Sequence, residues 1–233
     1  MLPVRDINPR RTTPFVNYVL ITLNIVAFAW ELTLGPRLPQ ELASIAFIPR
    51  ELFAPGRIVS DSFSIFVSMF LHAGWLHIGS NMLYLWIFGD NVEDRMGHGR
   101  YLIFYLLCGV IAALAHAFSS PGSQIPAIGA SGAIAGVLGA YLVLFPHARV
   151  MTFIPFGFVL LLRELPALLV LGLWFVLQLF TGVASLGIPE AVEHGGVAWW
   201  AHIGGFVAGL SLVFLFAKER KKAYRDDRRD PRW

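Results

Sequence analysis

Residues 127–136 read AIGASGAIAG, and they begin an apolar run that continues to about Phe145. One serine, Ser131, stands there among glycines and alanines. Taken alone, such a serine is most simply a small packing residue or a helix N-cap. The alternative is a nucleophile held inside a membrane. The rest of the chain decides between these two interpretations.

The composition is that of a membrane protein. Hydrophobic residues make up 56% of the 233 residues and charged residues only 14%, whereas soluble domains carry about 25% charged residues. A water-soluble domain of this length cannot bury so much apolar surface. We therefore expect an all-α fold, a polytopic helical bundle surrounded by lipid. Cys108 is the single cysteine, so no internal disulfide is possible.

Six apolar stretches approach or reach the 17–25 residues that a helix needs to cross a bilayer. They cover approximately 16–34, 72–88, 101–118, 131–145, 165–180 and 200–216. A further apolar segment, 150–162, is expected at the membrane interface. The sequence thus predicts a short N-terminal segment over 1–15, a six-span domain over 16–217, and a basic tail over 218–233.

Basic residues indicate the orientation of the bundle. Arg10 and Arg11 precede the first span, Arg95 and Arg100 lie between the second and third, and the tail adds eight more basic residues. Lysine and arginine are concentrated in cytoplasmic loops. We therefore expect both termini in the cytoplasm. The compact six-span form, without an added domain or targeting segment, suggests a location in the plasma (inner) membrane of a prokaryote.

This orientation brings polar residues from three spans to a similar depth. The second, fourth and sixth spans all begin at the outer side. Near their first turns they carry His72, His77, Asn81, Ser131 and His202. Polar side chains in lipid are costly and usually face the bundle interior or a water-filled cavity. His77 and Asn81 are four residues apart and share one helix face, whereas His72 is either structural or part of the site lining.

Small residues predict which helices pack closely. Stripes spaced by four occur in two spans. The fourth span has Gly132, Gly136 and Ala140, and the sixth has Ala201, Gly205 and Gly209. Such stripes allow helix backbones to approach each other. Ser131 and His202 each adjoin the first member of a stripe. If the two stripes pack together, the serine and the imidazole meet at the same depth.

A serine and a histidine in this arrangement suggest acyl-transfer chemistry. His202 would remove the proton of Ser131 and later return it to the leaving amine. His77, Asn81 and the N–H of Ser131 are candidate donors to the oxyanion. Gly129 and Gly132 would let a substrate backbone come close. The sequence has no acidic residue near His202, so it predicts a dyad.

Three segments in order resemble the signatures of the rhomboid family of intramembrane serine proteases. They are HAGWLHIGSN (72–81), GASG (129–132) and AHIGGFVAG (201–209), and EDRMGHGRY (93–101) resembles the stretch after the family's second span. The resemblance implies that Ser131 is the nucleophile, His202 the general base, and His77 and Asn81 part of the oxyanion hole. Some members stack a tyrosine on the catalytic histidine at the position that is Ala135 here.

The resemblance also implies the reaction and the partners. The enzyme would be a serine endopeptidase that cuts transmembrane segments of other proteins near their outer end. Substrates would enter laterally from the bilayer, beside the fifth span at 173–180. No cofactor and no nucleic acid are implied. The identity of the substrate and the oligomeric state stay open.

Three alternatives compete with this interpretation. A zinc ion held by His72, His77 and His202 is disfavoured, because there is no HExxH motif and no carboxylate in the outer half of these spans. An inactive relative that only binds membrane segments would be expected to lack the serine or the histidine. A six-helix transporter predicts inverted halves and charges deep in the spans, and the sequence has neither.

Overall fold

The structure is a computed structural model that describes residues 1–54, 58–157, 159–185 and 198–218. Its six longest helices are α1 (Phe15–Leu34), α5 (Trp75–Met96), α6 (His98–Ser119), α7 (Ser131–Leu144), α8 (Ala167–Ser185) and α10 (Trp199–Phe216). Short helices lie between α1 and α5: η1 (Gly35–Arg37), α2 (Leu38–Ile45), α3 (Pro49–Leu52) and α4 (Ile58–Ser68). The predicted tail beyond Lys218 and most of the loop before α10 lie outside the described residues.

Each predicted span corresponds to one long helix, and the mostly helical, multi-pass fold is confirmed. Four helical stretches in the described residues are both long and apolar enough to cross a membrane: Phe15–Ile45, His98–Ser119, Ala167–Ser185 and Trp199–Phe216. The other two helices depart from that pattern for visible reasons. α7 has only 14 residues, and α5 continues past the predicted end at 88 to Met96 through several charged residues.

A small antiparallel sheet was not predicted from the sequence. Its strands β1 (Leu2–Asp6), β2 (Arg149–Phe156) and β3 (Val159–Pro166) lie in the order β1-β2-β3. The segment 150–162, expected only to lie at the interface, thus forms most of a hairpin. Gly157 has a φ of +58° directly after β2, the left-handed conformation that two-residue hairpin loops require.

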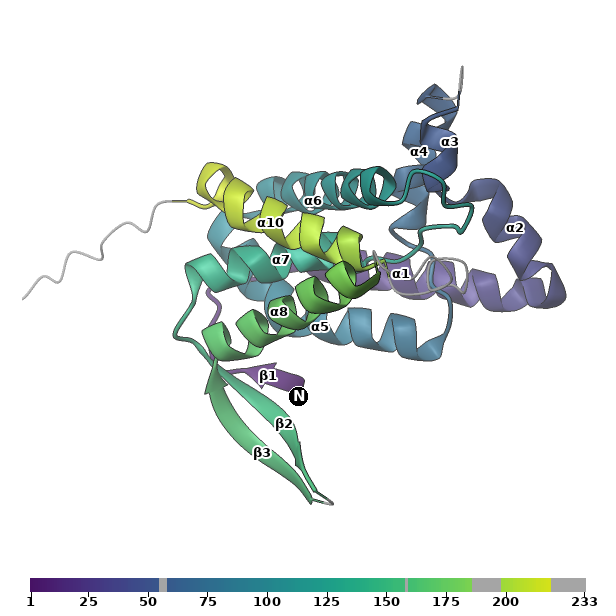
Figure 1. The fold of residues 1–233 in the computed structure, drawn as a ribbon. Coiled ribbons are helices and arrows are strands. Elements are labelled where there is room, and N and C mark those ends of the chain that lie inside the picture. The colour runs from purple at the N-terminus through teal and green to yellow at the C-terminus, as the bar shows by residue number, and fades with distance from the viewer. Residues whose placement is uncertain (55–57, 158, 186–197, 219–233) are drawn as a thin grey trace, which may run out of the picture.

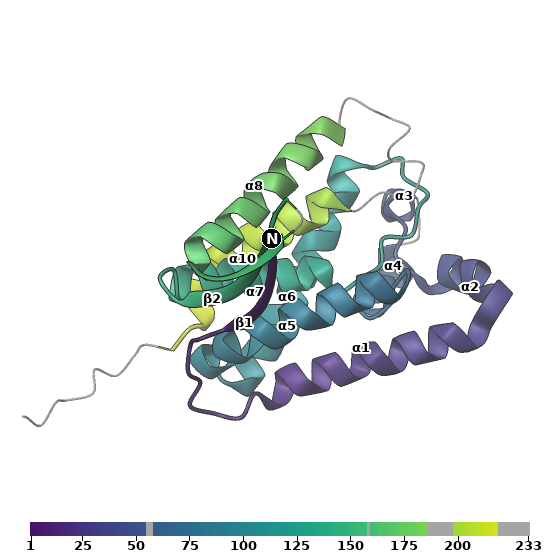
Figure 2. The same ribbon diagram turned by 90° about the horizontal axis from the view of Figure 1, so that it is seen from below.

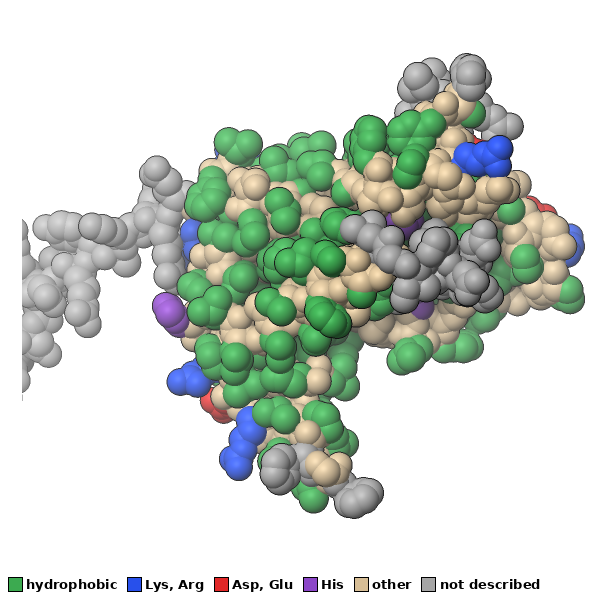
Figure 3. Space-filling model, in the orientation of Figure 1, with side chains coloured by type: hydrophobic (Ala, Val, Ile, Leu, Met, Phe, Trp, Pro, Cys, Tyr) green, Lys and Arg blue, Asp and Glu red, His purple; other side chains and the backbone are tan. Residues whose placement is uncertain are grey.

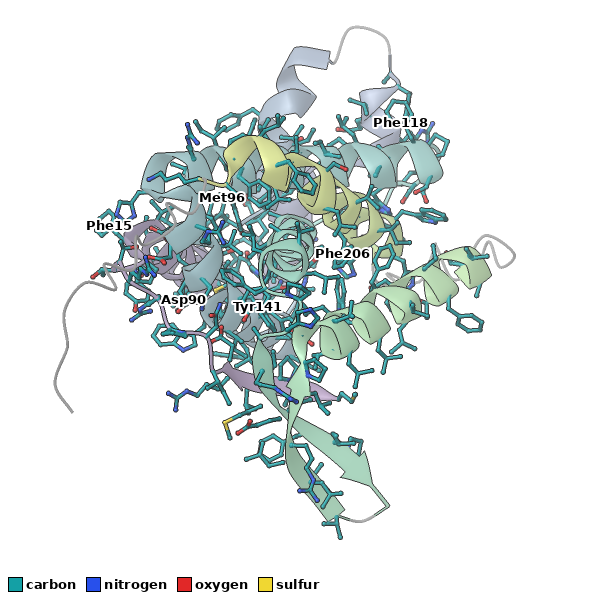
Figure 4. The ribbon with its side chains drawn as sticks, turned by 90° about the vertical axis from the view of Figure 1, so that its left-hand side faces the viewer. Phe15, Asp90, Met96, Phe118, Tyr141 and Phe206 are labelled. Carbon is teal, nitrogen blue, oxygen red and sulfur yellow. The ribbon has the colours of Figure 1, made fainter. Side chains whose placement is uncertain are left out.

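The short helix α7 forms the centre of the bundle. Ten consecutive residues of α7, from Gly132 to Tyr141, are buried, and α5, α6, α8 and α10 all contact it. Figures 1 and 2 show α7 enclosed by these longer helices. Viewed along the bundle, Tyr141 of α7 and Phe206 of α10 lie near its middle (Figure 4). A helix surrounded on all sides by protein has no need to match the bilayer thickness.

The outer helices present apolar side chains to their surroundings. Ile25 and Val26 of α1, Ile103 of α6 and Leu177 of α8 are all at least half exposed. Figure 3 shows hydrophobic side chains over most of the visible surface of the bundle, with charged ones near its ends. Such a large apolar surface suits hydrocarbon and not water. The chain is therefore a multi-pass membrane protein.

Carboxylates at the end of α5 anchor the start of α1. Pro14, at the N-cap of α1, supplies no capping hydrogen bond, and Glu93 takes that role from another helix. Its carboxylate accepts the N–H groups of Val16 (3.0 Å) and Asn17 (2.7 Å). The first N–H groups of a helix have no intrahelical acceptor, and a negative charge there is favourable. We call this end of the bundle the terminal end; it holds β1, the start of α1 at Phe15 and the end of α5 at Met96.

Candidate active site

Ser131 is the first residue of α7, and Tyr141 near the other end of this helix donates to Asp6 of β1 (2.8 Å), so Ser131 lies at the end of α7 away from the sheet. The loop before it is fixed by a hydrogen bond from the N–H of Gly129 to the carbonyl of Ser68 (2.8 Å). Gly129 has a φ of +124°, which residues with a side chain rarely adopt. This glycine therefore turns the chain sharply and sets the serine at the helix start.

His202 reaches Ser131 from the first turn of α10. The Oγ of Ser131 lies 2.8 Å from the Nε2 of His202. This short distance depends on close backbone packing between α7 and α10. A Cβ added to Gly205 would collide with the carbonyl oxygen of Gly132, and one added to Gly209 would collide with that of Gly136. The two predicted stripes thus face each other in the structure.

The second ring nitrogen of His202 contacts a residue that the sequence analysis missed. The Nδ1 lies 2.7 Å from the Oε1 of Gln178 in α8. A carboxamide oxygen only accepts hydrogen bonds, so this contact is a hydrogen bond when the ring proton is on Nδ1, which leaves Nε2 to accept the Ser131 hydroxyl. The indole of Trp174, also in α8, lies 5.9 Å from the imidazole between ring centroids.

His77 is oriented as a hydrogen-bond donor toward the space beside Ser131. The N–H of Ala73 donates to its Nδ1 (3.3 Å), so the ring proton is on Nε2. A Cβ on Gly129 would lie 2.7 Å from that Nε2 and 3.7 Å from the Oγ of Ser131. His77 and Ser131 therefore flank the space left open by Gly129.

Asn81 and His72 occupy different positions around His77. Asn81, one turn further along α5, is 6% exposed, and its Nδ2 has no hydrogen-bond partner among the described residues. His72 lies beside the ring of His77, with centroids 5.0 Å apart. Its backbone N–H donates to the buried carboxylate of Glu31 (3.0 Å). His72 thus contacts His77, and no contact with Ser131 is found among the described residues.

A small cavity of about 40 Å³ adjoins Ser131. Its lining includes Gly129, Ala201 and His116 of α6. His116 is not among the site residues predicted from the sequence, although a histidine near the end of an apolar span indicates a polar site. The Nδ1 of His116 is buried and has no partner among the described residues. A cavity of this size has room for water beside the serine.

The arrangement contains the parts of a serine hydrolase site. A hydroxyl contacts a neutral imidazole in the orientation that general-base catalysis needs, and donors converge on the adjacent space.

The zinc alternative involves three histidines, His72, His77 and His202. In the described part of the chain, no group of three or more potential ligands is arranged to hold a metal ion.

Comparison with known proteins identifies similar chains. The family model of the Rhomboid domain matches residues 60–219. The chain is 27% identical to Rhomboid protein 1, mitochondrial, of Saccharomyces cerevisiae over 210 residues, which cover 88% of this chain and 54% of that protein. It is 30% identical to Rhomboid protease GluP of Bacillus subtilis over 200 residues, or 85% of this chain and 35% of that protein. RHOMBOID-like protein 5 of Arabidopsis thaliana is 28% identical over 206 residues, 88% of this chain and 59% of that protein. The chain thus spans about a third to three fifths of the length of these relatives.

Proposed function

Because the chain belongs to the rhomboid family, we propose that it is an intramembrane serine endopeptidase with Ser131 as nucleophile and His202 as general base. One observation carries this proposal: the 2.8 Å contact between the Ser131 hydroxyl and the His202 imidazole inside the bundle. Two relatives at moderate identity support it, one of them described as a rhomboid protease.

The proposed reaction proceeds in two steps. The Oγ of Ser131 attacks the peptide carbonyl while its proton passes to Nε2 of His202. His202 then gives this proton to the leaving amine, and an acyl-serine forms. In the second step water attacks the ester, again losing a proton to His202, and the proton returns to Ser131 as the acid product leaves.

The oxyanion of each tetrahedral intermediate needs donors that are already oriented. The Nε2–H of His77 is one candidate, because its Nδ1 is occupied by the N–H of Ala73. The N–H of Ser131, in the first turn of α7, is a second. Asn81 is a third, since its buried Nδ2 has no partner in the described structure. A buried donor without a partner costs about 1–3 kcal/mol, and an oxyanion would offset that cost.

The length of α7 supports cleavage beneath the membrane surface. Its 14 residues span about 21 Å at 1.5 Å per residue, against a hydrocarbon thickness of about 30 Å. If its other end is near the opposite interface, Ser131 lies roughly 9 Å below the surface. The scissile bond would therefore belong to a transmembrane segment, close to its end on the side of Ser131.

The orientation and location are part of the proposal. Four arginines belong to the terminal end of the bundle: Arg10 and Arg11 contact Asp90 and Asp94 of α5, and Arg95 and Arg100 lie in the last turn of α5 and the first turn of α6. Ser131 begins α7, whose Tyr141 contacts Asp6 of β1, so it lies at the other end. Positive residues favour the cytoplasmic side. We propose that the terminal end is cytoplasmic, in a plasma (inner) membrane, and that Ser131 faces the outer leaflet.

A reporter with one transmembrane segment tests the proposal. The purified protein is reconstituted with the reporter in liposomes, and cleavage products are mapped by mass spectrometry. We expect cleavage by the unaltered protein and none by Ser131→Ala. Ser211→Ala is the matched control, since the Ser211 hydroxyl is exposed and bonds to the Val207 carbonyl of its own helix (2.9 Å), and cleavage should persist. Binding of the reporter without cleavage by the unaltered protein would support an inactive membrane-protein binder instead.

A further inference from the structure

Gln178 is a buried polar residue in an otherwise apolar helix. It lies in LWFVLQLF (173–180) of α8 and is only 9% exposed, whereas its neighbours Leu177, Leu179 and Phe180 are exposed. Leu171 and Gly182 share its helix face and are also buried. A carboxamide buried in a membrane protein is costly unless it finds a hydrogen-bond partner. Its Oε1 lies 2.7 Å from Nδ1 of His202.

We infer that Gln178 is a positioning residue that fixes the tautomer and the direction of the His202 imidazole; this inference rests on the proposed function. A neutral imidazole has one N–H and one acceptor nitrogen. If the proton were on Nε2, His202 could not accept the hydroxyl proton of Ser131. The Oε1 of Gln178 holds the proton on Nδ1, so the lone pair on Nε2 points at the serine. The site therefore has a third member, supplied by α8.

A carboxamide suits this place in a membrane. The third member of a Ser-His-Asp triad is a carboxylate, which both orients the ring and stabilises its charged form. A buried carboxylate next to lipid is far more costly than an amide. Gln178 supplies the orientation without a charge. Because the charge stabilisation is missing, we expect its loss to slow the reaction by roughly 10–10²-fold, less than the ~10⁴-fold of a triad whose aspartate is replaced.

The location of Gln178 also links the base to the packing of α8. Ser131 and His202 belong to α7 and α10, which pack tightly, whereas α8 contacts mainly α10, with smaller contacts to α7 and the strands. A displacement of α8 by about 1 Å would stretch the 2.7 Å contact to about 3.7 Å, where a hydrogen bond is lost. The His202 imidazole thus keeps its orientation toward Ser131 only while α8 is packed against α10.

The experiment measures the tautomer of His202 directly. The protein is labelled with ¹⁵N-histidine in lipid nanodiscs, and the His202 signals are identified by their absence in His202→Ala. The unaltered protein should show a protonated Nδ1 and an unprotonated Nε2. Gln178→Leu should yield a mixture of tautomers or Nε2–H alone, and Gln178→Glu should restore the Nδ1–H form. Thr181→Val is the control on α8, because the Thr181 hydroxyl contacts backbone carbonyls of that helix, those of Leu177 (2.7 Å) and Gln178 (3.1 Å), so its loss leaves the Gln178 carboxamide in place.

A second variant disturbs α8 without changing Gln178. A Cβ on Gly182 would lie 2.9 Å from the Cδ1 of Ile203 and 3.4 Å from the Cβ of Trp199. Gly182→Leu should therefore push α8 away from α10 and shift the His202 tautomer in the same direction as Gln178→Leu. An unchanged tautomer in a folded Gly182→Leu protein would overturn the link to α8.

Fluorophosphonate labelling of Ser131 provides the kinetic readout. Its rate should fall 10–10²-fold in Gln178→Leu and recover in Gln178→Glu, while Thr181→Val stays unchanged. An Nε2–H tautomer in the unaltered protein, or a tautomer that Gln178→Leu does not alter, would overturn the inference. If the tautomer responds as expected but Ser131 never labels, the positioning role stands and the proposed protease function fails.

Discussion

Replacing Gly209 by alanine tests whether close packing of α7 and α10 creates the site. The added Cβ would lie 2.6 Å from the carbonyl carbon and 2.7 Å from the Cα of Gly136, with the carbonyl oxygen nearer still. Ordinary contact begins at 3.4 Å, so the helices must separate by at least about 0.8 Å, the difference between 3.4 and 2.6. The same separation would lengthen the 2.8 Å contact between Ser131 and His202 to about 3.6 Å, beyond hydrogen-bond range.

We therefore expect Gly209→Ala to lose activity although both reacting residues remain. General-base assistance contributes about 10²–10⁴-fold in rate, so fluorophosphonate labelling of Ser131 should slow by at least ~10²-fold. Overpacking of this kind costs about 1–3 kcal/mol, so the protein should still fold, with a lower Tm in detergent.

The matched control is Gly172→Ala in α8, where an added Cβ meets nothing within 4 Å. It should label at the unaltered rate and be as stable or slightly more stable. A folded Gly209→Ala protein that labels as fast as Gly172→Ala would refute the argument from helix packing.

Three further predictions concern other parts of the molecule. Burial raises the pKa of the Asp6 carboxyl from 3.8 to about 6, although the hydrogen bond from Tyr141 acts in the opposite direction. The packed form of β1 therefore favours the neutral acid, so packing of β1 should be strongest below about pH 4 and weaken as the pH rises to about 6. Proteolysis of the N-terminal segment at different pH values should show this dependence, and Asp6→Asn should abolish it. Glu93→Gln should lower the free energy of unfolding by about 1–2 kcal/mol, and with it the Tm, because charge-assisted hydrogen bonds to the first turn of α1 are lost. Asp94→Asn, which alters an exposed contact, should lower the Tm by less. Asn81→Ala should lower kcat for the reporter by up to ~10²-fold with little change in KM, as expected for one of several oxyanion donors; a change confined to KM would count against that role.

The sequence predicts the helices well because their cause is local. A run of about 20 apolar residues forms a membrane-spanning helix regardless of which helices it contacts. Accordingly, α1, α6 and α10 begin and end within a few residues of their predicted bounds. The contact of α7 with α10 was also predictable, because residues spaced by four on each helix share one face.

The parts that the sequence did not predict depend on contacts between distant segments. β1 pairs with β2 across about 150 residues, for example Leu2 with Phe153, and nothing in residues 1–15 alone specifies that partner. Gln178 is one polar residue in an apolar helix, and its proximity to His202 follows from how α8 is rotated against α10. The sequence predicts a dyad of Ser131 and His202, and Gln178 is not among the site residues that it indicates.

The most direct test of the central claim is labelling of the unaltered protein and of His202→Ala by a fluorophosphonate, with the modified residue mapped by mass spectrometry. An imidazole that activates the hydroxyl predicts an adduct on Ser131 in the unaltered protein and a rate at least ~10²-fold lower in a folded His202→Ala protein. Equal rates in the two proteins, or an adduct on a residue other than Ser131, would contradict the account.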